Sequence, residues 1–237
     1  MRLRHDGWML AVSLLLAPLI WFVFNHTALD QAMIAPYYDA HSRSFPWRSD
    51  PFMQTVMHDG LKMIVVAVGV VVFGGFVLTY IIPQWRHHRR PLIWMLVAIA
   101  GSTELVSLLK HVSGMHCPWD LAEYGGYAPF ERLFEHMPVT GGGRCFPGGH
   151  ASGGFSLMAF YFGLRHVHAR RAQIGLVVAL ALGMAMGWAQ MIRGAHFLSH
   201  NVWSAWVVWT FMAMLYHLCP PHVARPSTPE DAEFNGS

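Results

Sequence analysis

Charged residues are scarce in this sequence. They make up 12% of the 237 residues, whereas hydrophobic residues make up 54%. Ordinary soluble domains carry about 25% charged residues, so this much apolar surface needs a solvent other than water. The formal net charge of +3 is also small, and the basic residues that cluster lie beside apolar runs. The composition therefore indicates a membrane protein and does not indicate binding to nucleic acid.

Other patterns are absent as well. The sequence has no internal repeat, no low-complexity segment and nothing that suggests a second globular domain. It also lacks the short segments of alternating polar and apolar residues that a transmembrane β-barrel requires. It contains instead six apolar runs, which are the candidate membrane spans: 8–24, 63–85, 91–109, 149–164, 172–192 and 201–218.

We predict that these runs are transmembrane helices. A bilayer core takes about 20 residues of α-helix, and backbone groups cannot stay unpaired in hydrocarbon. The run at 149–164 is short and contains glycine. The expected fold class is all-α, a polytopic membrane protein with six transmembrane helices in one integral membrane domain, 1–219. The segment 220–237, with its Pro, Ser and acidic residues, is predicted to be a short disordered cytoplasmic tail.

Basic residues in the short loops set the predicted orientation. Such loops retain Lys and Arg on the cytoplasmic side. The loops after the second and fourth runs contain arginines and no acidic residue, so six spans place both termini in the cytoplasm. A cleaved signal peptide is the rival interpretation of the N-terminus, but no convincing small-residue cleavage site follows Phe24. We expect an uncleaved protein in the bacterial inner membrane.

Reactive side chains gather at the predicted outer, periplasmic ends of four spans. They are Lys110, His150, Arg193, His196 and His200. Two cations and three imidazoles can supply what phosphoryl transfer requires: charge neutralisation, a nucleophile and a proton donor. Arginine suits this task because its planar guanidinium donates two hydrogen bonds to a phosphate. These residues form the candidate phosphate site.

A glycine-rich turn, Pro147-Gly148-Gly149-His150, precedes the fourth run. A turn of this kind before a helix presents free backbone N–H groups and the positive end of the helix dipole. Gly148 and Gly149 are therefore candidate phosphate ligands. Close packing between membrane helices is the alternative explanation for these glycines, and the pattern alone does not choose between the two.

Two of the three cysteines, Cys117 and Cys145, lie in the second predicted outer segment. If that side is an oxidising periplasm, they can form a disulfide that closes a loop of about 28 residues. Cys219, in contrast, lies at the inner end of the sixth run.

Three short motifs occur in order along the predicted outer face. They read Lys110-x6-Cys117-Pro118, Pro147-Gly148-Gly149-His150 and Ala189-Gln190-x5-His196-x3-His200. Their order and internal spacing resemble the three motifs of the type 2 phosphatidic acid phosphatase superfamily, which includes membrane lipid phosphatases and vanadium-dependent haloperoxidases. The resemblance covers roughly 109–206, and the six-span layout agrees with the membrane members of that family.

The resemblance implies a role for each matched residue. His196 would be the nucleophile that attacks phosphorus and forms a phosphohistidine, and His150 would protonate the leaving oxygen. Lys110 would hold the phosphate oxygens, assisted by backbone amides near Gly148 and Gly149. The mechanism implied in this way uses no metal and no cofactor.

Four positions depart from the family pattern. Cys117 and Gln190 stand at positions where the motifs have arginine. Gly148 stands at the serine position, and His200 stands at the aspartate position. Arg193 lies one near-turn after Gln190 on a helix, and Arg144 lies just before Cys145, so each can replace a missing cation. A neutral His200 can accept a hydrogen bond from His196 and fix its tautomer. It cannot supply the negative charge of the aspartate.

The expected function is hydrolysis of a lipid phosphate or diphosphate presented from the outer leaflet, as a phosphoric monoester or lipid diphosphate hydrolase of the acid phosphatase type. The sequence indicates membrane lipids as surroundings and no protein partner. Three alternatives stay open: transfer of the phosphoryl group to another lipid, a non-catalytic protein that binds phosphate lipids, and a zinc or copper site. The metal ligands would come from His116, Cys117, His150, His196 and His200.

Overall fold

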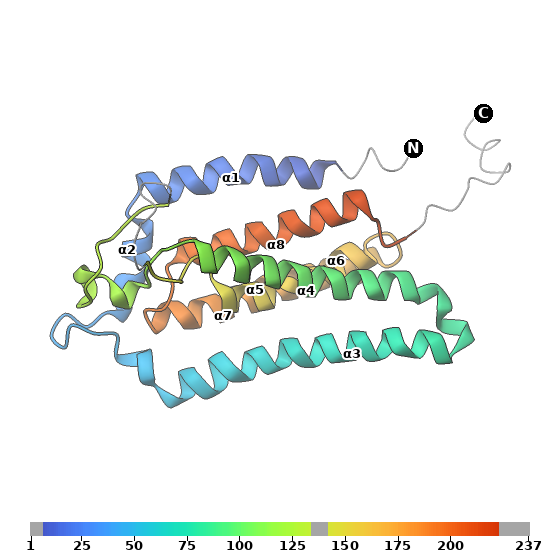
Figure 1. Cartoon of the computed structure of the whole chain (residues 1–237), viewed down its shortest axis with the longest axis horizontal. Coiled ribbons are helices and arrows are strands. Elements are labelled where there is room, and N and C mark those ends of the chain that lie inside the picture. The colour runs from blue at the N-terminus through green and yellow to red at the C-terminus, as the bar shows by residue number, and fades with distance from the viewer. Residues whose placement is uncertain (1–6, 134–141, 223–237) are drawn as a thin grey trace.

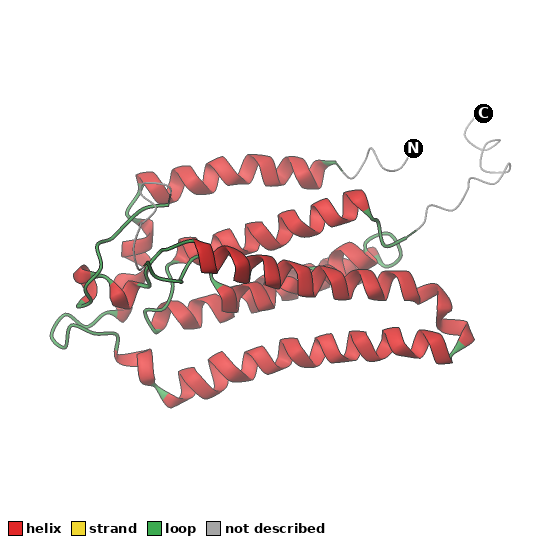
Figure 2. Ribbon diagram, in the orientation of Figure 1, coloured by secondary structure: helices red, strands yellow, loops and turns green. Residues whose placement is uncertain are grey.

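Long antiparallel helices form the body of the protein (Figures 1 and 2). The computed structural model describes residues 7–133 and 142–222, and the long elements within them are all helices. No strand occurs in these described ranges, so the all-α prediction is confirmed. The long helices are α1 (Trp8–His26), α3 (Leu61–Ile81), α4 (Arg89–Val112), α7 (Ala169–Ile192) and α8 (Leu198–Leu218).

Four helical segments of the described chain are long and apolar enough to cross a membrane. Each of them buries only 11% to 39% of its most apolar stretch inside the protein. Apolar side chains left outside in this number need lipid around them, so the protein is a membrane protein. The four segments are Trp8–His26, Met53–Ile81, Pro83–Val112 and Ala169–Ile192.

The two remaining predicted spans lie inside the bundle. The run at 149–164 is divided into α5 (Gly149–Ser156) and α6 (Ala159–Leu164), and each of these is too short to cross a bilayer alone. α8 is long, but its first turns carry polar residues such as Asn201 and Ser204, both fully buried. Helices that neighbouring helices shield from lipid can carry such residues.

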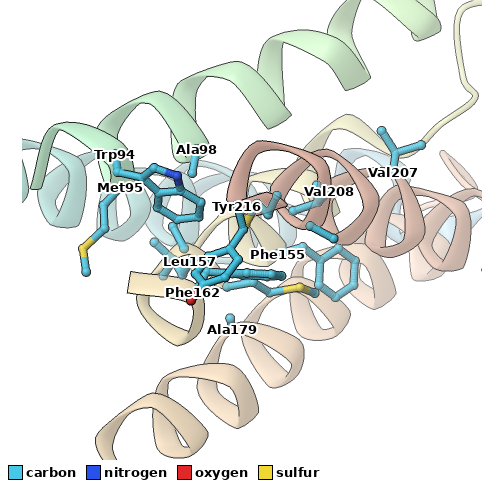
Figure 3. Packing of buried hydrophobic residues seen from close by; sticks show 14 of the residues in the cluster. Trp94, Met95, Ala98, Phe155, Leu157, Phe162, Ala179, Val207, Val208 and Tyr216 are labelled. Carbon is cyan, nitrogen blue, oxygen red and sulfur yellow. The ribbon is translucent and has the colours of Figure 1, made fainter. Parts of the chain in front are cut away.

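The main core lies where α4, α5, α6, α7 and α8 meet. Phe155 and Phe162 are almost completely buried there, and the Phe162 ring lies 6.1 Å from Trp94 and 5.9 Å from Tyr216 (Figure 3). Glycine permits the close approach of α5 and α7, because a Cβ atom on Gly183 would overlap the Phe155 ring. Small residues have this role generally where membrane helices cross.

A cap of loops and short helices covers one end of the bundle, at the left in Figure 1. It contains α2 (Leu29–Ile34) and the segments 35–52 and 113–133, joined by a second buried apolar cluster. A disulfide between Cys117 and Cys145, with Cα atoms 5.1 Å apart, ties the cap to the turn before α5. The members of the cluster are Ile34, Phe45, Leu121, Tyr124, Ala128 and Phe197.

The opposite end of the bundle holds the start of α1, the end of α8 and the turn between α3 and α4 (Figure 1). That turn contains η5 (Pro83–His88), in which Arg86, His87 and His88 follow one another. The tail predicted at 220–237 lies outside the described residues from 223 onward. The cap and the basic turn are therefore at opposite ends of the helices.

Candidate active site

His196 and His200 form a buried pair at the cap end of the bundle. His196 lies in the loop between α7 and α8, and His200 lies in the first turn of α8; their Nδ1 atoms are 3.3 Å apart. Their exposed fractions are 3% and 1%. One ring therefore donates an N–H and the other accepts it. Burial lowers the pKa of His196 well below 6.5, so its imidazole is neutral at neutral pH and has a lone pair for attack.

The cap fixes the loop that carries His196. Gly194 has a φ of +75°, which glycine adopts without strain. A side chain at this position would also overlap the Phe45 ring. The Gly194 carbonyl accepts the N–H of Trp119 at 3.0 Å. The cap segments 35–52 and 113–133 thus both contact Gly194, two residues before His196.

Asp30 of α2 forms a hydrogen bond with the start of α8. Its Oδ1 atom accepts the backbone N–H of Ser199 at 2.8 Å, and only 7% of the residue is exposed. Burial raises the pKa of this carboxyl to about 6, while hydrogen bonds from Ser199 and Leu198 oppose the rise. The family motifs contain no equivalent, and the sequence around Asp30 gave no signal that it belongs to the site.

Lys110, near the end of α4, lies close to the first turn of α5, which carries His150. A Cβ atom on Gly149 would lie 3.8 Å from the Lys110 Nζ atom, so the amine faces the first turn of α5. The lysine also has charge interactions with His150, His196 and His200. An ammonium group beside a helix N-terminus and three imidazoles favours a bound anion.

The backbone N–H of Gly148 has a partner within the protein. Its N–H donates to the carbonyl of His200 at 3.0 Å, so this amide is not free to bind a phosphate, contrary to the prediction. A Cβ atom at position 148 would approach Asn201 Oδ1 to 2.7 Å, so a serine here would require the Asn201 side chain to shift. Gly149, at the start of α5, keeps the free N–H of a first helical residue.

Arg193 lies at the C-terminus of α7 and belongs to the candidate phosphate site. Its Nη1 atom donates to Gln190 Oε1 at 3.3 Å, and its Nε atom donates to the carbonyl of Arg48 at 3.2 Å. It also has a charge interaction with His150. Gln190, at the motif position of an arginine, therefore holds the guanidinium of the residue one near-turn later.

Arg144 and Cys117 are the remaining predicted ligands. Arg144 is exposed, and no hydrogen bond or ion pair of its side chain is seen within the described ranges. Cys117 is part of the disulfide and cannot coordinate a metal as a thiolate. Among the described residues, no three His, Cys, Asp or Glu side chains are grouped to hold a metal ion. The metal alternative therefore has no ligand set in this part of the chain.

Two further residues reach the site from η4 (Met53–Gly60), a π-helix that continues into α3. The ring of His58 lies on the ring of His150, with centroids 3.7 Å apart. Asp59 Oδ1 is 2.9 Å from His58 Nδ1. No sequence motif includes these two residues, although an adjacent His and Asp at the start of an apolar run was a usable signal.

The protein is therefore a helical membrane protein in which three histidines and a lysine gather at the capped end of the bundle. Residues 91–223, more than half of the chain, match the family model of the PAP2 superfamily. The chain belongs to that superfamily, which confirms the resemblance seen in its motifs. Membership indicates phosphatase-type activity in a membrane-associated protein. No curated protein and no solved structure matches the chain.

Proposed function

We propose that the protein is a membrane phosphatase that hydrolyses a lipid phosphate or diphosphate through a phosphohistidine on His196. The observation that carries this proposal is the gathering of Lys110, His150, Arg193, His196 and His200 at one end of the bundle. Membership of the PAP2 superfamily supports the reaction class. The apolar surface around the helices supports a lipid substrate, because such a substrate stays in the bilayer while its phosphate enters from the cap end.

In the first step, the free ring nitrogen of His196 attacks phosphorus. An N–P bond forms, the P–O bond to the lipid breaks, and a proton passes from His150 to the leaving oxygen. Lys110 and Arg193 neutralise the phosphate oxygens. In the second step, water attacks the phosphohistidine, His150 takes the water's proton, and inorganic phosphate leaves with His196 restored.

His200 acts on His196 through their hydrogen bond. Because the Nδ1 atoms of the two rings contact each other, we assign the attack on phosphorus to Nε2 of His196. A histidine in place of an acid can fix the tautomer, but it leaves the charge that develops on His196 without a carboxylate partner. We expect a slower enzyme than one with an acid at this position.

The proposed topology has six spans and a periplasmic site. α8 and the α5–α6 pair supply the two crossings beyond the four apolar segments, and both termini are then cytoplasmic in a bacterial inner membrane. Two observations support this arrangement. The start of α1 and the end of α8 lie at the same end of the bundle (Figure 1), and that end carries the arginine-rich turn between α3 and α4.

The test is release of inorganic phosphate from a panel of lipid phosphates by the purified full-length protein. We expect His196→Ala to abolish release and His150→Ala to reduce it at least 100-fold, with and without a strong chelator. The matched control is His87→Ala, in the turn at the other end of the bundle. Wild-type rates in folded His196→Ala protein would contradict the proposal.

Transfer to an acceptor lipid is the second outcome of the same assay. It appears as a new phosphorylated lipid without an equal amount of free phosphate. Binding of the substrate with no turnover of either kind would identify a non-catalytic member of the superfamily.

A further inference from the structure

The π-helix η4 stands outside the part of the chain that matches the superfamily, yet two of its side chains reach the candidate active site. π-helical turns are rare, and they occur frequently at functional sites. Its last two turns carry His58 and Asp59, followed by Lys62 in α3. None of the three motifs includes these residues.

The geometry of His58 leaves one of its nitrogens available. Nδ1 lies 2.9 Å from Asp59 Oδ1, so Nε2 is the free nitrogen. The ring is tilted by 36° over His150 at a centroid distance of 3.7 Å. The side chains of His58 and Asp59 are 31% and 68% exposed. The pair therefore lies at the mouth of the site and not in the core.

The surroundings of this pair are positively charged. Lys62, Lys110 and Arg193 each have a charge interaction with His150, the ring that His58 covers. Asp59 interacts with Lys62 and Arg193, so this carboxylate faces two of the three permanent cations. We expect an anion drawn to these cations to meet His58 as well, because the His58 ring lies on the ring of His150.

We propose that His58, oriented by Asp59, is a substrate ligand that donates its Nε2–H to a phosphate oxygen beside His150. This inference rests on the proposed phosphatase function and adds a residue to its substrate-binding set. With a carboxylate at Nδ1 and a phosphate at Nε2, each ring nitrogen of His58 faces a hydrogen-bond acceptor. His58 then replaces the cation that the motif pattern has at position 117, where this chain has a disulfide-bonded cysteine.

A purely structural role would consist of packing on His150, and a pair of substitutions separates the two roles. His58→Phe keeps an aromatic ring over His150 but removes the N–H, whereas His58→Gln removes the ring but keeps a donor. Asp59→Asn removes the carboxylate that orients the imidazole. The matched control is His41→Phe, an exposed histidine in the cap.

The measurement is the Kd of the full-length protein in detergent for inorganic phosphate, beside KM and kcat for a lipid phosphate. A lost charge-assisted hydrogen bond corresponds to about 10- to 100-fold, and we expect this rise in Kd and KM for His58→Phe. His58→Gln and Asp59→Asn should raise the Kd about 3- to 10-fold, a smaller loss because a donor remains. His41→Phe should bind as the wild type does.

The inference is overturned if His58→Phe binds phosphate within about twofold of the wild type, or if the wild type binds no inorganic phosphate. Thermal unfolding of each variant shows that it is folded. If the wild type releases no phosphate from any lipid, the proposed function fails, while the Kd series still decides whether His58 is a phosphate ligand. If His196→Ala abolishes turnover and His58→Phe changes nothing, the proposed function stands without this residue.

Discussion

The carboxylate of Asp30 accepts the backbone N–H of Ser199, 169 residues later in the chain, at 2.8 Å. This bond joins α2 of the cap to the first turn of α8, between the two histidines of the buried pair. An acid at a helix N-terminus satisfies N–H groups that have no partner within the helix and interacts favourably with the helix dipole. Asp30 therefore positions His200, and through it His196, from outside the three motifs.

Replacing Asp30 with Ala should destabilise the protein and lower kcat. The substitution leaves buried N–H groups of Leu198 and Ser199 without an acceptor, at a cost of about 1–3 kcal/mol. Asp30→Asn keeps an acceptor oxygen and should retain more activity. Thermal unfolding and phosphate release measure the two effects. Unfolding is compared at pH 4, where the folded protein holds Asp30 protonated. Equal stability of the alanine variant and the wild type at that pH would show that Asp30 does not anchor α8.

The raised pKa of Asp30 also predicts a pH dependence of stability. Burial raises the pKa of Asp30 from its ordinary value of 3.8 to about 6 in the folded protein, so the folded protein binds this proton more tightly than the unfolded chain does. The free energy of unfolding should therefore fall as pH rises from about 4 to about 6, by about 3 kcal/mol from this group. Asp30→Asn should lack this component. Unfolding of both proteins at pH 4, 5, 6 and 7 measures the difference, and parallel curves would contradict the assignment.

The pH dependence of turnover should reflect the burial of His196. A nucleophilic imidazole must be neutral, and burial lowers the pKa of His196 well below 6.5. Protonation of this ring should therefore inhibit kcat/KM only at pH values well below 6.5. A profile of kcat/KM against pH checks this expectation. Loss of the phosphohistidine at pH 6.5, measured in a single turnover, would show that the imidazole titrates like an exposed one.

Arg193 should contribute to phosphate binding with help from Gln190. We expect Arg193→Gln to raise KM about 10-fold or more, since a charge-assisted hydrogen bond is lost. Adding Gln190→Arg to that variant should recover part of the loss, because the cation then stands at the motif position. The control is Arg86→Gln, in the turn at the other end of the bundle. No recovery in the double variant would mean that the two positions do not reach the same phosphate.

The disulfide between Cys117 and Cys145 should stabilise the cap. Closing a loop of 28 residues contributes about 2–4 kcal/mol, so Cys117→Ser with Cys145→Ser should lower the unfolding temperature. Cys219→Ser, which removes the exposed free cysteine, is the control. Thiol labelling of the unfolded wild type should detect one thiol without reductant and three with it. Three thiols in both samples would contradict the bond.

The membrane fold could be predicted because its cause is local. A run of about 20 apolar residues that meets lipid can satisfy its backbone only as a helix, and 8–24 and 172–192 show this in sequence and in structure. The helices inside the bundle were harder to recognise as spans. Their polar residues, such as Asn201, are buried by neighbouring helices that are distant in the sequence.

The candidate site was predictable where the motifs carry it. The spacing of Lys110, His150 and His196 indicated both the superfamily and the residues that gather at the cap end. The prediction was wrong for Gly148, because a backbone N–H has no sequence signature for its partner, and here the partner is the carbonyl of His200.

By itself, the sequence determined that the chain is a helical membrane protein of this superfamily, since apolar length and motif spacing are properties of short segments. Only the tertiary structure decided which other groups meet the motif histidines. Asp30 reaches α8 from a cap helix, and His58 covers His150 from a π-helix. These contacts join distant segments through the packing of the cap and the bundle, so no local pattern of residues specifies them.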